Sequence, residues 1–219
     1  MRLKSFIEVN LMNCWSELDE YILDKFGDLE LKKPLFYNAR YGLRFDLGSD
    51  LEINQGRVEQ VYYRSKSLFY EINSNEDELF FVIFADFWND EPMLTIKDEV
   101  INVFQNYLKD FSIAEINQVV IPYRYKEDDE DDTMTLRVYI KRKVKDIKLD
   151  DLLVSMADGN VYGDIYLINS KKHVIYDLYD DRGLDIISCY KESLYKLYTD
   201  YNNWILEYDR KRIDKIFLS

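Results

Sequence analysis

Two runs of alternating apolar and polar residues lie between Gly163 and Gly183, separated by a polar turn. Apolar side chains recur at every second position, as a strand with one buried face requires. They are Ile165, Leu167, Val174, Tyr176 and Leu178. Residues 169–172, with the sequence NSKK, are polar and turn-prone. We therefore predict a β-hairpin with one buried face here, followed by a further strand that ends near Ser188.

The hydrophobic pattern predicts strands in four other places. They are residues 35–47, 79–84, 119–121 and 135–144. The first is expected to break near Gly42, and the second, LFFVIF, is continuously apolar, which suits a central strand covered on both faces. Residues 85–92 are expected to be a loop, and Pro122 favours an edge position for the third strand. Several connections are too short for crossovers, so the sheet is expected to be mostly antiparallel.

Apolar residues at steps of three and four predict amphipathic helices that cover this sheet. The expected helices are residues 3–26 with a second start at Ser16, 54–72, 95–111, 150–156 and a long helix over 188–208, followed by a final turn to Phe217. A chain of 219 residues is long enough for a real core. The fold class is therefore predicted to be α+β, with a mostly antiparallel sheet covered by amphipathic helices in a single domain over residues 1–219. A split near residues 110–115 is the alternative.

Acidic residues outnumber basic ones, with 42 Asp and Glu against 29 Lys and Arg and a formal net charge of −13. Such a surface repels phosphate backbones and anionic lipids, so we expect no direct nucleic-acid partner and no membrane partner. A basic protein is an allowed partner, although solubility is the commoner reason for an acidic composition. The 19 tyrosines suit core edges and interfaces alike.

Six consecutive acids lie between the strands predicted at residues 119–121 and 135–144. They are Glu127, Asp128, Asp129, Glu130, Asp131 and Asp132. The run lacks the glycine and the alternating spacing of a calcium-binding loop. We predict the exposed tip of a hairpin, which is either a solvated loop or a partner-binding patch that steers a basic protein.

Few residues could support catalysis or hold a metal ion. His173 is the only histidine, and Cys14 and Cys189 are far apart, so neither a nucleophile–histidine site nor a zinc site is indicated. The glycines stand singly, without a phosphate-binding pattern. We expect no cofactor, no metal and two reduced thiols. Residues 1–26 contain no signal-peptide core, so a cytoplasmic location is expected.

The segment Asp180-Asp181-Arg182 is the best catalytic candidate, because adjacent carboxylates could bind Mg²⁺ and the arginine an anion. Neighbouring residues of a strand point to opposite faces, which disfavours a shared ion. The favoured interpretation is a structural loop over Tyr179, Asp180, Asp181, Arg182 and Gly183. In it an aspartate binds loop amides, Arg182 pairs with a carboxylate and Gly183 takes a positive φ.

Two segments, YDDRGLDI over residues 179–186 and YNNWILEYDR over residues 201–210, resemble a bacterial family known as a domain of unknown function, number 3885. Residues 34–38 and 43–48 are similar to the family's opening strands, so the resemblance covers nearly the whole chain. It implies no activity and therefore no catalytic residue.

The leading hypothesis is a non-enzymatic cytoplasmic binding protein, with an immunity-type inhibitor of a basic protein, such as a nuclease toxin, as its sharpest version. Acidic single-domain immunity proteins of toxin systems are similar in type only. The alternative is a metal- or anion-using enzyme centred on Asp180, Asp181 and Arg182. A structural or regulatory module is the third possibility, and the sequence sets no oligomeric state.

Overall fold

The computed structural model describes residues 16–49, 51–52, 55–88, 91–125 and 132–218. The strands are β1 (Tyr41–Asp46), β2 (Glu78–Trp88), β3 (Asn117–Pro122), β4 (Thr133–Lys143), β5 (Asp164–Asn169), β6 (Val174–Asp180) and β7 (Gly183–Ser188). Within the described residues they form one seven-stranded sheet in the order β1-β7-β6-β5-β2-β4-β3. Every neighbouring pair is antiparallel, which confirms the predicted α+β class and single domain.

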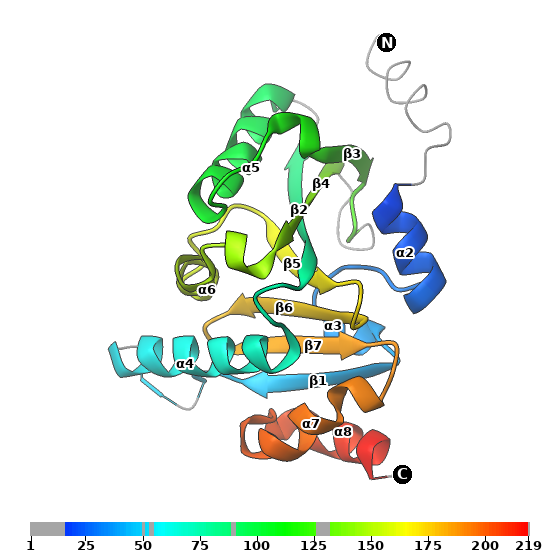
Figure 1. The fold of residues 1–219 in the computed structure, drawn as a ribbon, viewed down its shortest axis with the longest axis vertical. Helices are drawn as coiled ribbons and strands as arrows, with labels where there is room; N and C mark the ends of the chain where they lie inside the picture. The colour runs from blue at the N-terminus through cyan, green and yellow to red at the C-terminus, as the bar shows by residue number, and fades with distance from the viewer. Residues whose placement is uncertain (1–15, 50, 53–54, 89–90, 126–131, 219) are drawn as a thin grey trace.

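The helices pack on both faces of this sheet. They are α2 (Glu17–Phe26), α3 (Leu35–Asn38), α4 (Gln55–Ile72), α5 (Met93–Tyr107), α6 (Leu149–Ala157), α7 (Glu192–Asp200) and α8 (Arg210–Phe217). Helices α4, α5 and α6 cover one face, α2 and α3 lie on the other, and α7 and α8 pack beside the edge strand β1 (Figure 1). The sheet twists strongly, so that β2 stands nearly upright in Figure 1 while β6, β7 and β1 run across it.

Strand β2 shows why both faces need a cover. Phe81 and Ile83 belong to the larger core beneath α4, α5 and α6, while Phe80, Val82 and Phe84 belong to the core beneath α2. Strands β5 and β6 divide their apolar side chains in the same way. The sequence-based expectation that the hairpin over residues 163–183 has a single buried face is therefore wrong. Its second face is closed by α2 and by the segment that leads to α3.

Helix α2 begins where the capping pattern predicts. The Ser16 hydroxyl accepts a hydrogen bond from the Asp19 backbone N–H at 3.3 Å, and the Asp19 carboxylate accepts one from the Ser16 N–H at 3.1 Å. These reciprocal bonds satisfy two of the free amides at the helix start. Asp19 also receives the Arg137 guanidinium at 2.5 and 2.6 Å, which fastens the beginning of α2 to β4.

Residues 35–38 form the short helix α3 instead of the predicted strand, and β1 starts only at Tyr41. The reason is a long-range contact, because the Phe36 backbone N–H donates to the buried Asp185 carboxylate at 2.9 Å. The predicted loop at residues 85–92 is also wrong in its first half. Strand β2 continues to Trp88, since its residues pair with β4 and Thr135 donates a hydrogen bond to Asp86.

The C-terminal region is divided where one long helix was predicted. Helix α7 ends at Asp200, and two single 3₁₀ turns, at residues 202–204 and 207–209, precede α8. The Arg210 guanidinium binds the side-chain and backbone oxygens of Asn202, each at 2.8 Å, and the Ile205 carbonyl at 3.4 Å. These contacts stabilise carbonyl groups that would otherwise continue a helix, and Tyr208 consequently points outward with 86% exposure.

We expect Gly183→Ala to reduce the free energy of unfolding by about 1–3 kcal/mol, because a Cβ there overpacks the site. It would lie 1.9 Å from the Tyr179 hydroxyl oxygen and 3.0 Å from the Phe45 carbonyl oxygen. Urea unfolding measures the loss. The matched control is Gly56→Ala on the exposed surface of α4, where alanine should stabilise the helix by up to about 1 kcal/mol. Equal stability of wild type and Gly183→Ala would contradict the packing argument.

Candidate functional site

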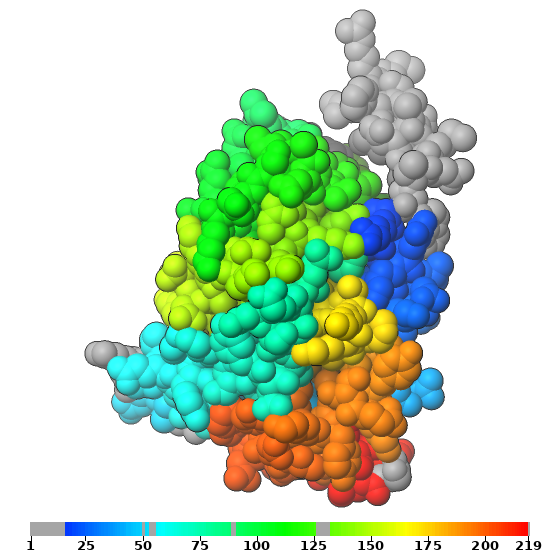
Figure 2. Space-filling view, viewed as in Figure 1, coloured from blue at the N-terminus to red at the C-terminus, as the bar shows by residue number. Residues whose placement is uncertain are grey.

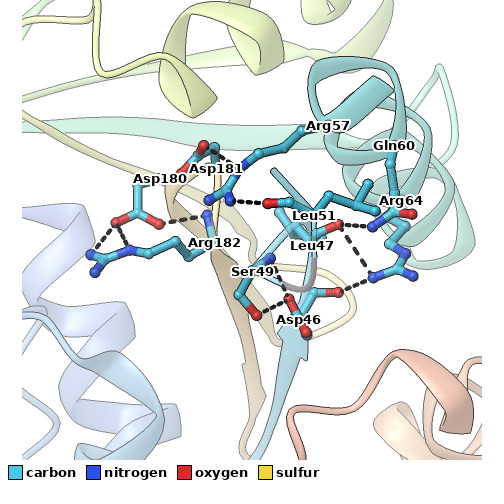
Figure 3. A network of polar contacts seen from close by, with 10 residues as sticks. All are labelled: Asp46, Leu47, Ser49, Leu51, Arg57, Gln60, Arg64, Asp180, Asp181 and Arg182. Carbon is cyan, nitrogen blue, oxygen red and sulfur yellow. Dashed lines mark hydrogen bonds and ion pairs between the residues drawn. The ribbon is translucent and has the colours of Figure 1, made fainter. Parts of the chain in front are cut away.

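The turn between β6 and β7 contains the three residues proposed for catalysis, and the Asp180 and Asp181 side chains point apart, with Arg182 folded onto Asp180 (Figure 3). The Asp180 carboxylate accepts hydrogen bonds from the Arg182 backbone N–H at 2.8 Å and from the Arg182 Nε at 2.9 Å. The Asp181 carboxylate instead receives Arg57 Nε from α4 at 2.6 Å. Each carboxylate is thus bound to its own arginine, and the two do not converge on a common ion position.

Helix α4 holds the end of β1 beside this turn. The Arg64 guanidinium donates to the Asp46 and Leu47 carbonyls at 2.9 and 3.2 Å, and the Gln60 amide donates to the Leu47 carbonyl at 2.8 Å (Figure 3). The Leu47 N–H donates to the Arg182 carbonyl at 2.9 Å. These contacts make the turn a junction between three elements, with its polar groups used inside the protein.

Gly183 is required here for space and not for backbone conformation. It is absent from the described glycines with positive φ, so that part of the predicted turn is wrong. Tyr179 is an extra residue between the Leu178–Leu184 and Asp180–Gly183 pairs, and this bulge turns its ring toward Arg44, 5.4 Å from the guanidinium carbon. The close approach of Tyr179 leaves no room for a side chain at residue 183.

The predicted partner-binding run falls mostly outside the described residues. Glu127, Asp128, Asp129, Glu130 and Asp131 are not described, and Asp132 is exposed at the start of β4. Strands β3 and β4 do form the predicted antiparallel hairpin, with β3 at the edge of the sheet. In the connection after β3 the Tyr125 hydroxyl accepts a hydrogen bond from the Lys33 N–H at 2.9 Å, which places the hairpin against the segment between α2 and α3.

A row of polar residues crosses the sheet beneath that segment. Arg44 on β1 binds the fully buried Asp185 on β7, with its Nε 2.8 Å and an Nη 3.4 Å from the carboxylate oxygens. The same guanidinium lies 3.5 Å from Asp209, which accepts a hydrogen bond from the Tyr37 hydroxyl at 2.8 Å. Burial raises the pKa of Asp185, opposed by Arg44 and by the Phe36 N–H.

The row continues into two groups that lack a hydrogen-bond partner in the described part of the chain. Asp177 on β6 is fully buried, with both carboxylate oxygens unbonded, and the Tyr166 hydroxyl on β5 is likewise buried and unbonded. Burial raises the pKa of Asp177 well above its usual range, against the opposing charge of Lys33. A neutral carboxyl at this depth is the favourable state, because an unpaired buried charge is costly.

Neither Asp177 nor Asp185 is among the site residues predicted from the sequence, because the predicted hairpin has only one buried face. The sequence did contain a signal, because apolar residues occupy both the odd-numbered and the even-numbered positions of these strands. Ile175 and Ile187 each lie two residues from one of the aspartates, on the same face of the strand, and both isoleucines are fully buried. A carboxylate among such neighbours indicates a buried polar group.

The remaining candidate ligands stand apart. His173 takes a positive φ of 55° in the turn between β5 and β6, with its Nδ1 3.3 Å from the Tyr21 hydroxyl oxygen. Cys189 is a partly buried free thiol, and Cys14 lies outside the described residues. Across the described ranges no three His, Cys, Asp or Glu side chains are grouped so as to hold a metal ion.

A family model for a domain of unknown function, DUF3885, matches residues 18–209. The chain belongs to this family. The match includes all the strands of the described sheet, the buried row and the turn between β6 and β7. The chain is also similar to the protein named Uncharacterized protein YnaE of Bacillus subtilis (strain 168), with 23% identity over 212 residues, covering 86% of this chain and 96% of that protein. No solved structure matches.

The two arginines at the turn should differ in their effect on stability. Arg57→Ala should lower the free energy of unfolding by roughly 2 kcal/mol, since it removes a charged hydrogen bond from a buried arginine. Arg182→Ala should cost less than about 1 kcal/mol, because the Arg182 side chain is 68% exposed. Thermal and urea unfolding of both variants test this order. A larger loss in Arg182→Ala would show that the exposed pair is the main tie of the turn.

Asp177 should make the protein less stable as the pH rises. A folded pKa above the unfolded value means that the stabilising contribution is complete below about pH 4 and is lost toward neutral pH, by about 1.4 kcal/mol per pH unit. Asp177→Asn removes this dependence, so its stability relative to wild type should increase as the pH rises above about 4. Lys33, Asp164, Asp185 and Arg124 also face this group and are retained in the variant.

Urea unfolding across this pH window measures the difference between the two proteins. The exposed Asp158→Asn is the matched control, and its difference from wild type should not vary with pH in the same way. Parallel stability curves for wild type and Asp177→Asn would show that Asp177 does not titrate abnormally.

Proposed function

We propose that this chain is a non-enzymatic binding protein for a basic protein, and that its sharpest version is an immunity-type inhibitor of a toxin such as a nuclease. The observation that carries the proposal is a concentration of acids on one side of the fold. Residues 17–30 contain six acids and one lysine, and the α2 part of this segment lies against β4, one strand of the acidic hairpin. Acidic surfaces accelerate encounter with a basic partner.

The contacts that hold α2 on the hairpin are themselves charged. Arg137 binds Asp19, and Lys141 forms an ion pair with Glu17. These pairs use two of the basic residues of β4, while Glu20 and Asp28 remain exposed. The acidic character of this side is therefore retained after the internal pairs have formed.

The enzyme alternative has less support from the geometry of the turn between β6 and β7. A site that uses Asp180, Asp181 and Arg182 would need those groups to converge, whereas Asp180 is paired with Arg182 and Asp181 with Arg57. The favoured role of the turn is to join β1, β7 and α4. Loss of partner binding in Arg182→Ala with unchanged melting would instead move Arg182 into a functional surface.

A cytoplasmic location is part of this proposal and rests on the two isolated cysteines and the charged N-terminal sequence. In the part of the chain that the structure describes, no helix has the length and apolar character needed to cross a membrane. A binding protein that acts on a basic toxin in the producing cell would meet it in that compartment.

Capture from the native host followed by mass spectrometry should identify a partner with a basic surface. Replacing Asp128, Asp129, Asp131 and Asp132 with Asn should then slow association with that partner several-fold at low salt, with less effect on dissociation. The difference should shrink at high salt, because screening acts within about 8–10 Å near physiological ionic strength. Asp98→Asn combined with Glu99→Gln, two exposed acids on α5, is the control.

An association rate that is indifferent to both the four substitutions and the salt concentration would leave the run as a solvated tip. A captured partner that is acidic, or a purified protein that turns over a substrate without any partner, would overturn the proposed binding function itself.

A further inference from the structure

We propose that the cleft between α2, residues 27–32 and the β3–β4 hairpin is the docking surface for a segment of the basic partner that carries apolar side chains. This inference rests on the proposed function and specifies where the partner binds. The cleft has a volume of about 560 Å³. In Figure 2 the blue surface of α2 borders the green surface of the hairpin on this side of the molecule.

The walls of the cleft combine apolar and charged side chains. Its lining includes Leu18, Ile22, Leu23, Leu31, Phe84 and Ile121, which come from α2, the following segment, β2 and β3. Leu18, Leu31 and Phe84 are buried in the core beneath α2, whereas Leu23 is 54% exposed. The exposed part of Leu23 gains free energy when a partner's apolar side chains cover it.

Two arginines also line the cleft, and both are neutralised by internal partners. Arg124 is only 7% exposed, binds Asp164 at 2.7 Å and lies over the Phe84 ring, 4.3 Å from its centroid. Arg137 binds both oxygens of Asp19. These pairs position α2 and the hairpin relative to each other, so the cleft is preformed, and they prevent the arginines from repelling a cationic ligand.

The rim of the cleft is acidic, which complements a basic segment. Asp28 and Glu30 line it and are exposed, and Glu20 extends the negative surface along α2. Glu30 is paired with Lys32, which also lines the cleft, so the negative charge of the rim comes mainly from Asp28 and Glu20. Asp132, at the start of β4, is exposed on the hairpin. An apolar floor with a charged rim is the usual composition of a protein-binding surface, in which the floor supplies affinity and the rim steers the encounter.

The first test uses the full chain and a synthetic amphipathic peptide of leucine and lysine. A second peptide, with serine in place of leucine, has the same charge and serves as the comparison. Backbone NMR should show shift changes concentrated at α2, residues 27–32 and β3, and larger affinity for the leucine peptide. Equal affinity for both peptides, or shifts spread over the acidic surface without this focus, would overturn the cleft assignment.

The second test uses the partner obtained by capture and two matched variants. Leu23→Gln, at the cleft, should raise the Kd about tenfold, as expected for an apolar side chain at the centre of an interface. Leu94→Gln, on the first turn of α5 and 70% exposed, should leave the Kd unchanged. Circular dichroism and melting confirm that both variants fold, and Leu29→Gln repeats the test at a second cleft position if Leu23→Gln is unstable.

The outcomes separate the two proposals. A partner that binds wild type, Leu23→Gln and Leu29→Gln equally well overturns the cleft as the docking surface while leaving the proposed binding function standing. The absence of any basic partner overturns the proposed function. Loss of binding in the cleft variants alone supports both.

Discussion

The buried ion pair between Arg44 and Asp185 is the interaction on which the arrangement of this fold depends most. It joins β1 to β7, and the same carboxylate fixes α3 through the Phe36 N–H. Arg44 also reaches Asp209, just before α8, so the pair connects the start of the sheet with the C-terminal region. Removal of one partner from a buried pair typically costs 3–5 kcal/mol, roughly, because the other charge stays buried. This requirement explains why residues 35–38 fold as a turn over the sheet.

Next to this ion pair lie Asp177 and Tyr166, whose buried polar atoms have no hydrogen-bond partner among the described residues. Both occupy the face of the sheet that α2 and its following segment close. A neutral carboxyl can remain there, but it contributes less to stability than an apolar side chain of similar size. The segment after α2 is held on this face by Lys33, which binds Asp164 on β5 together with Arg124. Although burial raises the pKa of Asp164, these two cations hold it below its usual range.

The charges of this protein therefore have two different roles. Inside the fold, arginines bind carboxylates and join elements that are distant in the sequence, as Arg57 does with Asp181 and Arg137 with Asp19. Outside it, the excess of acids is left on α2 and on the hairpin side. At the turn between β6 and β7, Asp181 belongs to the first group, whereas Asp180 binds its exposed neighbour Arg182.

The local sequence was sufficient to predict the elements whose causes are local. The alternation over residues 163–183 predicted the hairpin, the Ser16 and Asp19 spacing predicted the start of α2, and the periodic stripe over residues 54–72 predicted α4. The partners of the charged groups were not predictable in this way. Arg44 and Asp185 are 141 residues apart in the sequence, and only the folded sheet brings them together. The tertiary structure likewise decided that α3 replaces a strand, that the last helix divides at Arg210, and that a second buried face encloses Asp177. Periodicity reports whether a side chain faces a core, whereas pairing and burial depend on which distant segment covers it.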